Sequence, residues 1–309
     1  MAQRLCTALL LSCSALLWAV PPQGHAESAF TCRAALSADI PPRAAHMPDG
    51  SGFAHRITKL VRGQRDAQTA RAVSSGDIPD FLRRLKPVVL HARSSDGRAL
   101  KATICVMPDY LAVGSDRDFL RMPMGFVAAA EVASRLGFVL PTPRMVDAIY
   151  HQSERHLLPQ PLRAGPQMRS TAYITRHNAD IFAQVRRLAA SPGLLLAGHK
   201  KDVVLSNRMD SHPGRMAIYG WHQADGEPIQ PLSTAHGLEY VDYSHGIRLV
   251  ADVMQLNGTI TSVHKVLTDA KLSVVLSDEG PIKNLERYIP LKGGRVAQTH
   301  NAMVALSGR

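Results

Sequence analysis

The sequence predicts an α+β protein in which a mainly antiparallel sheet packs against a helical portion. Apolar, β-branched runs at Pro87–Leu90 and Leu100–Met107 flank the turn signal Ser95-Asp96-Gly97, as in a hairpin. Apolar residues at helical spacing then dominate residues 123–190, and short strand-like runs return after residue 198. This distribution is typical of packed helical and β layers around one core.

The helices are predicted from their apolar spacing and their end signals. The first has Pro123 in its first turn, ends at Gly137 and repeats apolar residues at three- and four-residue steps: Phe126, Ala129, Ala130, Ala133 and Leu136. The second begins near Pro143, with an apolar face of Met145, Val146, Ile149 and Tyr150. The third is expected from Asn178 to Ala190, after a short strand at Thr171–Thr175.

The remaining segments have weaker patterns. Ala35–Arg71 is rich in Pro, Gly, Arg and His, so we expect irregular covering structure with a short helix at Ile57–Arg62. Further strands are expected at Tyr110–Val113, Val203–Leu205, Met216–Tyr219, Ile247–Val250 and Ser273–Leu276. No linker divides the chain, which predicts one mature domain over residues 27–309, with a His-rich β portion at about 198–280.

The first 26 residues have the pattern of a signal peptide. Arg4 is the one charged residue before Gly24, Leu5–Val20 is mostly apolar, and Gly24-His25-Ala26 supplies small residues around a cleavage position. Sixteen residues are short for a membrane span, and no later segment is long and apolar enough to cross a bilayer. We therefore expect cleavage after Ala26 and a periplasmic or secreted protein.

Two cysteines, Cys32 and Cys105, remain after the predicted cleavage. In an oxidising compartment two thiols most simply pair, which predicts a disulfide between them. The alternative is two buried free thiols. A catalytic cysteine is disfavoured, because neither residue is close in sequence to the His-rich segment.

The chain carries a formal net charge of +11. A basic exported protein favours anionic surroundings, so an envelope or extracellular polymer is the expected partner. Basic and aromatic residues are not interleaved as in nucleic-acid-binding proteins, and we expect no nucleic-acid partner.

Residues 198–248 hold five of the fourteen histidines, together with Lys, Asp, Ser, Tyr and Trp. The histidines there lie beside glycine or polar residues, where imidazole can act as acid, base or ligand. The predicted catalytic residues are His199, Asp202, His222, His236, Asp242, Ser244 and His245. The predicted substrate-binding residues are Lys200, Lys201, Trp221, Tyr240 and Arg248. We expect the histidines and Asp202 to line one pocket.

Three chemistries fit this segment. Ser244 could act as a nucleophile, with a histidine as its base and Asp202 or Asp242 as the orienting carboxylate. Zinc could instead be held by three ligands drawn from His199, Asp202, His222, His236, Asp242 and His245, leaving a position for water. The third is acid–base chemistry without a metal, in which Lys200, Lys201, Arg208 and Arg248 position an anionic group. We favour the third, with no cofactor, because no ligand spacing is diagnostic and two lysines adjoin His199.

Tyr243-Ser244-His245-Gly246-Ile247-Arg248-Leu249 resembles the signature of the YkuD-type L,D-transpeptidases. Their pattern is S-H-G-C followed by a hydrophobic residue and Arg, and Ile218–His222 resembles the family's earlier His-Gly strand. Ser244, His245, Gly246 and Arg248 match family positions, but Ile247 follows Gly246 where the nucleophilic Cys would stand. The resemblance implies envelope-polymer chemistry without cysteine-dependent transpeptidation.

Together these patterns predict an exported hydrolase or group transferase that acts on a cell-envelope or extracellular polymer, with peptidoglycan peptide bonds as the first candidate substrate. The alternative is a non-catalytic binding or assembly protein of the periplasm. In an enzyme the histidines should converge in one cleft. In a binding protein they should be scattered, while an apolar or basic surface is continuous.

Overall fold

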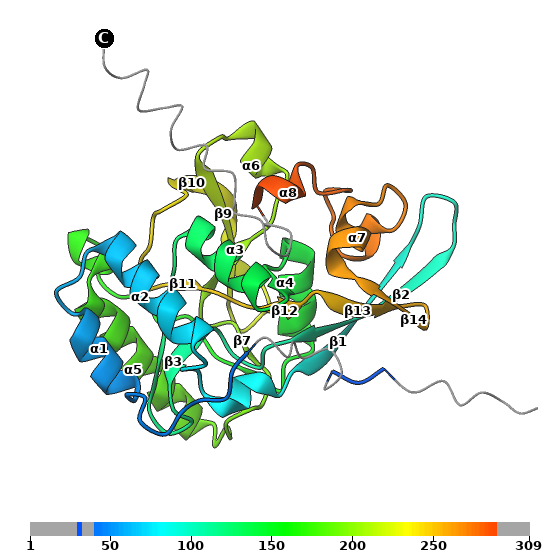
Figure 1. Cartoon of the computed structure of the whole chain (residues 1–309). Coiled ribbons are helices and arrows are strands. Elements are labelled where there is room, and N and C mark those ends of the chain that lie inside the picture. Colours follow the sequence, from blue (N-terminus) through cyan, green and yellow to red (C-terminus); the bar gives the residue numbers. More distant parts are fainter. Residues whose placement is uncertain (1–29, 33–39, 289–309) are drawn as a thin grey trace, which may run out of the picture.

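The computed structural model describes residues 30–32 and 40–288. The predicted signal segment and its cleavage position after Ala26 lie outside the described residues. The described chain forms two larger sheets, with helices packed around them (Figure 1). Buried apolar side chains from the sheets and the helices form one continuous core. The predicted α+β class is therefore confirmed.

The larger sheet is antiparallel and has the order β14-β13-β2-β12-β5, with β1 also paired to β2. Its strands are β1 (Lys86–Arg93), β2 (Ala99–Val106), β5 (Phe138–Val139), β12 (Val250–Ala251), β13 (Val253–Leu256) and β14 (Thr259–Ser262). The β1–β2 hairpin is the predicted one, with Leu90 opposite Ala102 and the turn at residues 94–98. Val88, Leu90, Ala102 and Ile104 face the core, as the alternation of side chains in a half-buried sheet requires.

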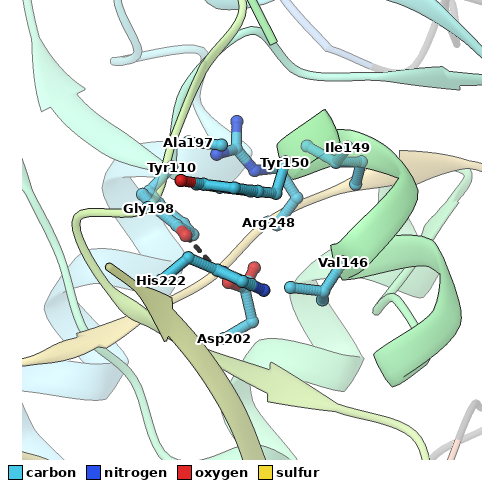
Figure 2. Close-up of a pocket in the computed structure, with 9 residues that line it drawn as sticks. All are labelled: Tyr110, Val146, Ile149, Tyr150, Ala197, Gly198, Asp202, His222 and Arg248. Carbon is cyan, nitrogen blue, oxygen red and sulfur yellow. Dashed lines mark hydrogen bonds between the residues drawn. The ribbon is translucent and has the colours of Figure 1, made fainter. Parts of the chain in front are cut away.

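The second sheet carries most of the His-rich segment and has the order β10-β9-β8-β11. Its strands are β8 (Lys201–Val204), β9 (Arg215–His222), β10 (Pro228–Gly237) and β11 (His245–Gly246). The first three are antiparallel to their neighbours, whereas β11 runs parallel to β8, with His245 opposite Lys201. Side chains from β8, β9 and the helix α4 line the pocket of Figure 2.

Two short pairs complete the strands: β3 (Ala112–Gly114) with β4 (Phe119–Arg121), and β6 (Arg155–His156) with β7 (Leu196–Ala197). The helices are α1 (Gly50–Ile57), α2 (Arg62–Ser74), α3 (Phe126–Arg135), α4 (Pro143–His151), α5 (Thr171–Arg187), α6 (Arg208–Ser211), α7 (Val263–Thr268) and α8 (Leu285–Tyr288). Helices α1, α2 and α5 gather on one side of the molecule, and α7 lies beside β13 and β14 on the other (Figure 1). Among the described residues, no helix combines the length and apolar character needed to span a bilayer.

Helix α4 forms as the sequence predicts. Thr142 caps it by accepting a hydrogen bond from the Met145 N–H, and Pro143 occupies the first turn, where its missing N–H costs nothing. Its buried residues are Met145, Val146, Ile149 and Tyr150. The opposite face carries Asp147 toward the end of β9, where its carboxylate meets Tyr219 and His222.

The expectation for the N-terminal region is wrong. Within Ala35–Arg71, helix α1 ends at Ile57 and α2 begins at Arg62, so the short helix expected at Ile57–Arg62 is instead the connection between two helices. Phe53, Ala54 and Ile57 supply the buried face of α1, at three- and four-residue spacing. Polar residues dominate α2, so its helical character is set by packing against the rest of the fold and not by a clear apolar stripe.

Further boundaries differ from the prediction. Of the strand expected at Ile247–Val250, Val250 alone belongs to a strand, and Pro123 lies before α3, which begins at Phe126. Helix α5 starts at Thr171, replacing the expected strand at Thr171–Thr175, because the Ser170 hydroxyl caps it by accepting from the Tyr173 N–H. The run Ser273–Leu276 was expected to be a strand and instead includes a short 3-10 turn at Ser273–Val275. Short apolar runs of this kind fit either structure, and here Val275 and Leu276 are buried in the core.

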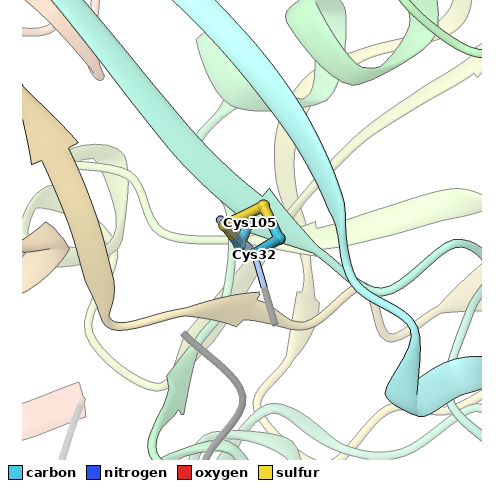
Figure 3. Close-up of a disulfide and its surroundings, with 2 residues drawn as sticks. All are labelled: Cys32 and Cys105. Carbon is cyan, nitrogen blue, oxygen red and sulfur yellow. A yellow bond between two sulfur atoms is a disulfide. The ribbon is translucent and has the colours of Figure 1, made fainter. Parts of the chain in front are cut away.

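The predicted disulfide between Cys32 and Cys105 is confirmed, with an S–S distance of 2.06 Å (Figure 3). Cys105 is fully buried on β2, a strand of the larger sheet that pairs with β1, β12 and β13. The bond joins residues 73 positions apart in the sequence. It therefore ties the N-terminal segment to the centre of the fold.

Candidate functional site

Two consecutive residues with positive φ control how β9 presents its side chains. Gly220 has a φ of 104° and Trp221 a φ of 59°, and the second value is rare for a residue other than glycine, asparagine or aspartate. These angles interrupt the alternation of the strand, so Tyr219 and His222 point to the same carboxylate. Asp147 Oδ1 accepts from the Tyr219 hydroxyl at 2.9 Å and lies 3.1 Å from His222 Nε2.

His222 and Asp202 line a narrow pocket between α4 and the second sheet (Figure 2). The Tyr110 hydroxyl donates to Asp202 Oδ2 at 2.8 Å. Burial raises the pKa of Asp202 to about 6, because the charged carboxylate loses solvation inside the protein. Asp202 can therefore exchange a proton near neutral pH. The Tyr150 ring stacks on His222 with ring centroids 4.3 Å apart and fixes the plane of the imidazole.

Arg248 also lines this pocket, but its two terminal nitrogens are hydrogen-bonded within the fold. Its two terminal nitrogens donate to the carbonyl oxygens of Met107 and Leu196, at 2.9 and 2.6 Å. Its guanidinium carbon lies 4.2 Å from the centroid of the Tyr110 ring, a cation–π distance. This arrangement holds the loop after β2 against β7, and it differs from the substrate contact expected from the sequence.

His199 belongs to a separate buried ion-pair network. Its Nε2 lies 3.1 Å from Asp109 Oδ1, and Arg121 forms a hydrogen-bonded ion pair with the same carboxylate. Burial lowers the pKa of His199 to about 4, so this imidazole is neutral at pH 7. Burial alone would raise the pKa of Asp109, but Arg121 and His199 hold it far below its usual range.

A second group of side chains lies at the end of β10 and the start of β11, and we name it the histidine cluster: His236, Tyr240, Asp242, Ser244 and His245. The His236 ring stacks on Tyr240 with centroids 4.0 Å apart and an interplanar angle of 5°. The His245 ring centroid lies 5.7 Å from that of His236, and its Nε2 lies 3.9 Å from Asp242 Oδ2. His236 and Tyr240 are half-buried, whereas Asp242, Ser244 and His245 are buried behind them.

The electrostatics of the histidine cluster favour neutral imidazoles. Burial lowers the pKa of His245 to about 4 against the opposing effect of Asp242, and burial also lowers the pKa of His236. Burial opposes ionisation of Asp242, but His245 and the hydrogen bonds from Ser244 hold its pKa below the ordinary value. The cluster therefore contains a carboxylate beside two unprotonated imidazoles at neutral pH.

Ser244 is oriented toward Asp242. Its backbone N–H and its hydroxyl both donate to Asp242 Oδ1, at 2.7 and 2.6 Å. The hydroxyl proton is therefore directed to a carboxylate and not to an imidazole. A nucleophilic serine needs the reverse arrangement, with a base that accepts its proton. In this structure Ser244 fixes the position of Asp242.

The two predicted lysines, one just before β8 and one at its first position, have different surroundings. Lys200 is 1% exposed, and its ammonium group donates to the Tyr243 carbonyl oxygen at 2.6 Å. Burial lowers the pKa of Lys200 to about 7. Lys201 is half-buried, and its Nζ lies 5.0 Å from the centroid of the Trp221 ring. Both lysines interact electrostatically with Asp242.

The structure thus divides the predicted site residues between separate places. Asp202 and His222 line the pocket of Figure 2 together with Arg248. His199 contacts Asp109 instead. His236, Asp242, Ser244 and His245 form the histidine cluster with Tyr240. Within the described part of the chain, no three His, Cys, Asp or Glu side chains are grouped so that they could hold a metal ion.

Four residues of these networks were missed by the sequence analysis: Asp109, Arg121, Asp147 and His177. Arg121 stands inside the apolar run Phe119–Met122, a signal that a buried carboxylate partner is needed. His177 lies on the buried face of α5 with Ile174 and Ile181, at helical spacing. Asp109 and Asp147 carry no local signal, because their partners are far away in the sequence.

Comparisons with known proteins identify no match for this chain. No family model, no curated protein and no solved structure matches the chain. The resemblance to the YkuD-type signature therefore rests on the residues around Ser244-His245-Gly246 alone. Ile247, which follows them, is fully buried in the core.

Proposed function

We propose that this protein is an exported hydrolase or group transferase that acts on a cell-envelope or extracellular polymer, with peptidoglycan peptide bonds as the first substrate to test. The observation that carries the proposal is the histidine cluster. A half-buried imidazole, His236, lies beside a buried imidazole, His245, whose Nε2 is 3.9 Å from Asp242 Oδ2 and makes no hydrogen bond in the described structure. Two neutral imidazoles beside one carboxylate can both accept and return a proton.

In the proposed reaction, His245 accepts a proton from a water molecule as the water oxygen bonds to the carbonyl carbon of the substrate. Asp242 stabilises the imidazolium that forms. As the carbon–nitrogen bond breaks, the proton that His245 accepted passes through His236 to the leaving amine, and both imidazoles return to the neutral form. In group transfer an acceptor amine or hydroxyl replaces the water. Ser244 takes no covalent part, because its hydroxyl is committed to Asp242.

A basic depression next to the histidine cluster supports an anionic polymer as the substrate. Its lining residues are Arg208, Ser211, His212, Arg215, Leu232, Ser233, Thr234 and Ala235. Two arginines and a histidine face this hollow, and no lining residue in the described chain is acidic. The depression follows β10 and ends one residue before His236. A chain of carboxylates or phosphates bound there would lead to the two imidazoles.

The disulfide and the sequence pattern of the first 26 residues support an extracytoplasmic location, since disulfides persist in oxidising compartments. The separation of the pocket of Figure 2 from the histidine cluster favours a second candidate function, a non-catalytic binding or assembly protein of the periplasm. In that protein the basic depression would bind the polymer, and the histidines would have no catalytic role.

Turnover of purified peptidoglycan by the exported chain separates the two functions. We expect His245→Ala to reduce turnover by about 100-fold or more, which is the usual contribution of a general acid or base. The exposed His91→Ala is the matched control and should retain full turnover. Thermal unfolding checks that both variants fold. Unchanged turnover in His245→Ala would remove His245 from the chemistry, and no turnover by the wild type would favour the binding protein.

The same preparations test the metal-free form of the proposal. We expect turnover to persist in a chelator and elemental analysis to find no stoichiometric metal. If the wild type bound zinc stoichiometrically and His245→Ala lost it, the metal-free mechanism would be wrong and a zinc-activated water would be the nucleophile.

A further inference from the structure

A group of buried hydrogen-bond donors next to the histidine cluster has no acceptor in the fold. The Trp221 indole nitrogen and both ring nitrogens of His177 have no hydrogen-bond partner within the described structure. The Lys200 ammonium group has three N–H bonds, and in the described structure it donates a hydrogen bond to the Tyr243 carbonyl oxygen. Lys200 and His177 are at most 1% exposed and Trp221 is 5% exposed. A buried donor without an acceptor costs about 1–3 kcal/mol, so several in one place indicate an acceptor that the chain itself does not supply.

These donors are neighbours in space, although they come from three elements. The His177 ring on α5 lies 6.4 Å from the Trp221 ring and 4.9 Å from the Tyr243 ring, measured between centroids. The Trp221 backbone N–H donates to the Lys200 carbonyl oxygen, which places Trp221 on β9 beside the residue that precedes β8. Lys200 also interacts electrostatically with His177 and with His245. It therefore joins the donor group to the histidine cluster.

Trp221 shows the second sign of a functional position. Its φ of 59° costs of order 1–3 kcal/mol for a residue with a side chain of this size. Such strain persists where the surroundings hold a side chain in a required place. Here it directs the indole to the side of the sheet that carries Lys201, which lies over its ring.

The charges around the donors favour an anion. Lys200 and Lys201 bring two ammonium groups, and Asp242 is the carboxylate that interacts with both. Asp242 already accepts two hydrogen bonds from Ser244 and interacts with His245. In the described structure the Trp221 indole N–H makes no hydrogen bond to this carboxylate. Burial lowers the pKa of Lys200 to about 7, and an anion beside it would offset that loss of solvation.

We propose that Lys200, Trp221 and His177 form a carboxylate-binding subsite that holds the free carboxylate of a peptide whose adjoining bond lies at the histidine cluster. A carboxylate accepts from several donors at once, which fits an ammonium, an indole N–H and an imidazole N–H around it. The inference rests on the proposed function for the reaction, but the binding event does not require turnover. The substrate class is thus a peptide with a free carboxylate and not an amidated one.

The test measures, by calorimetry, the binding of N-acetyl-alanyl-alanine and of its C-terminal amide to the exported chain. We expect the acid to bind at least 10-fold more tightly than the amide. Lys200→Met keeps the aliphatic stem and should abolish this preference. Trp221→Phe keeps an aromatic ring without the N–H and should weaken binding of the acid several-fold. Lys101→Met, on the exposed part of β2, is the matched control and should retain the preference.

A second measurement needs no variant. The sequence has two tryptophans, and Trp18 lies in the predicted signal segment, so Trp221 supplies the single indole N–H signal of the exported chain. We expect this NMR signal to shift on titration with the acid and to stay in place with the amide. His245→Ala should bind the acid like the wild type even though it lacks turnover, which separates the subsite from the catalytic proposal. Equal binding of acid and amide by the wild type, or a static indole signal, would overturn the subsite.

Discussion

At the scale of single residues, burial and not sequence neighbourhood sets the chemistry of the ionisable groups. Lys200, Lys201 and Asp202 are consecutive in the chain, yet the first is buried against a carbonyl, the second lies over an indole and the third is bonded to a tyrosine hydroxyl. The sequence identified all three as site residues. It could not assign their environments, because successive residues of a strand face opposite sides.

Asp202 provides a prediction at this scale. Burial raises its pKa to about 6 from an ordinary value of 3.8, so the folded protein holds this proton more tightly than the unfolded chain does. Its contribution to stability is therefore fully present below about pH 4 and is lost as the pH rises to about 6. The shift corresponds to about 3 kcal/mol.

We expect Asp202→Asn, which can still accept from Tyr110 but cannot ionise, to match the wild type near pH 4. Above pH 6 it should be more stable by up to about 3 kcal/mol. Urea unfolding between pH 4 and 8 measures the difference, with the exposed Glu131→Gln as the control that should follow the wild type. A difference between Asp202→Asn and the wild type that does not grow from pH 4 to pH 6 would contradict the raised pKa.

At the scale of elements, prediction succeeded where local signals and burial agree. The β1–β2 hairpin has a turn signal between two β-branched runs, and α4 has a threonine cap, a proline in its first turn and a clear apolar face. The sequence does not predict α2, because its residues are mostly polar. It predicts the start of α5 seven residues late, because Asn178 as well as Ser170 can cap a helix. Cap residues are ambiguous when more than one precedes an apolar face.

The end of β9 gives a prediction for one element. Gly220 has a φ of 104°, which an alanine adopts only with strain, whereas an added Cβ would meet the nearest atoms, on His222 and Val146, at an ordinary 3.4 Å. The cost of Gly220→Ala should therefore come from the backbone, at about 1–3 kcal/mol of unfolding free energy. Relief of that strain would rotate His222 and Trp221 away from their partners.

Gly97→Ala is the matched control. Gly97 also has a positive φ, of 83°, but it lies in the β1–β2 turn with no atom within 4 Å of an added Cβ. Both variants should lose stability in urea unfolding, and only Gly220→Ala should change the indole fluorescence of the folded state and the turnover. An unchanged fluorescence spectrum in Gly220→Ala would show that the φ of Gly220 does not control the position of Trp221.

At the scale of the whole molecule, strands of the His-rich segment form one sheet, but several of their side-chain partners come from outside the segment. Residues 198–248 supply β8 to β11, as strands and loops rich in histidine suggested. Asp109, Asp147 and His177 lie 44 or more residues away from the residues of this segment that they contact, and Arg121 acts through its ion pair with Asp109. Such pairings depend on the packing of the sheets and helices, which no local spacing encodes.

The disulfide gives the prediction that belongs to the whole fold. Joining residues 73 positions apart removes conformational freedom mainly from the unfolded chain, which corresponds to about 4 kcal/mol on the chain-entropy model. We expect Cys32→Ser to lower the unfolding free energy by about this amount, with little change in the folded state, because Cys105 stays packed in β2. Urea unfolding with and without a reducing agent measures it.

The reductant itself supplies the control for that comparison. It should destabilise the wild type to the level of Cys32→Ser and have no further effect on the variant. Because the bond acts on the unfolded state, turnover and peptide binding under native conditions should stay close to the wild-type values. If reduction instead abolished binding while the protein remained folded, the bond would be needed to hold β2, and through the loop at Asp109 and Tyr110 the site itself. The chain-entropy account would then fail for this protein.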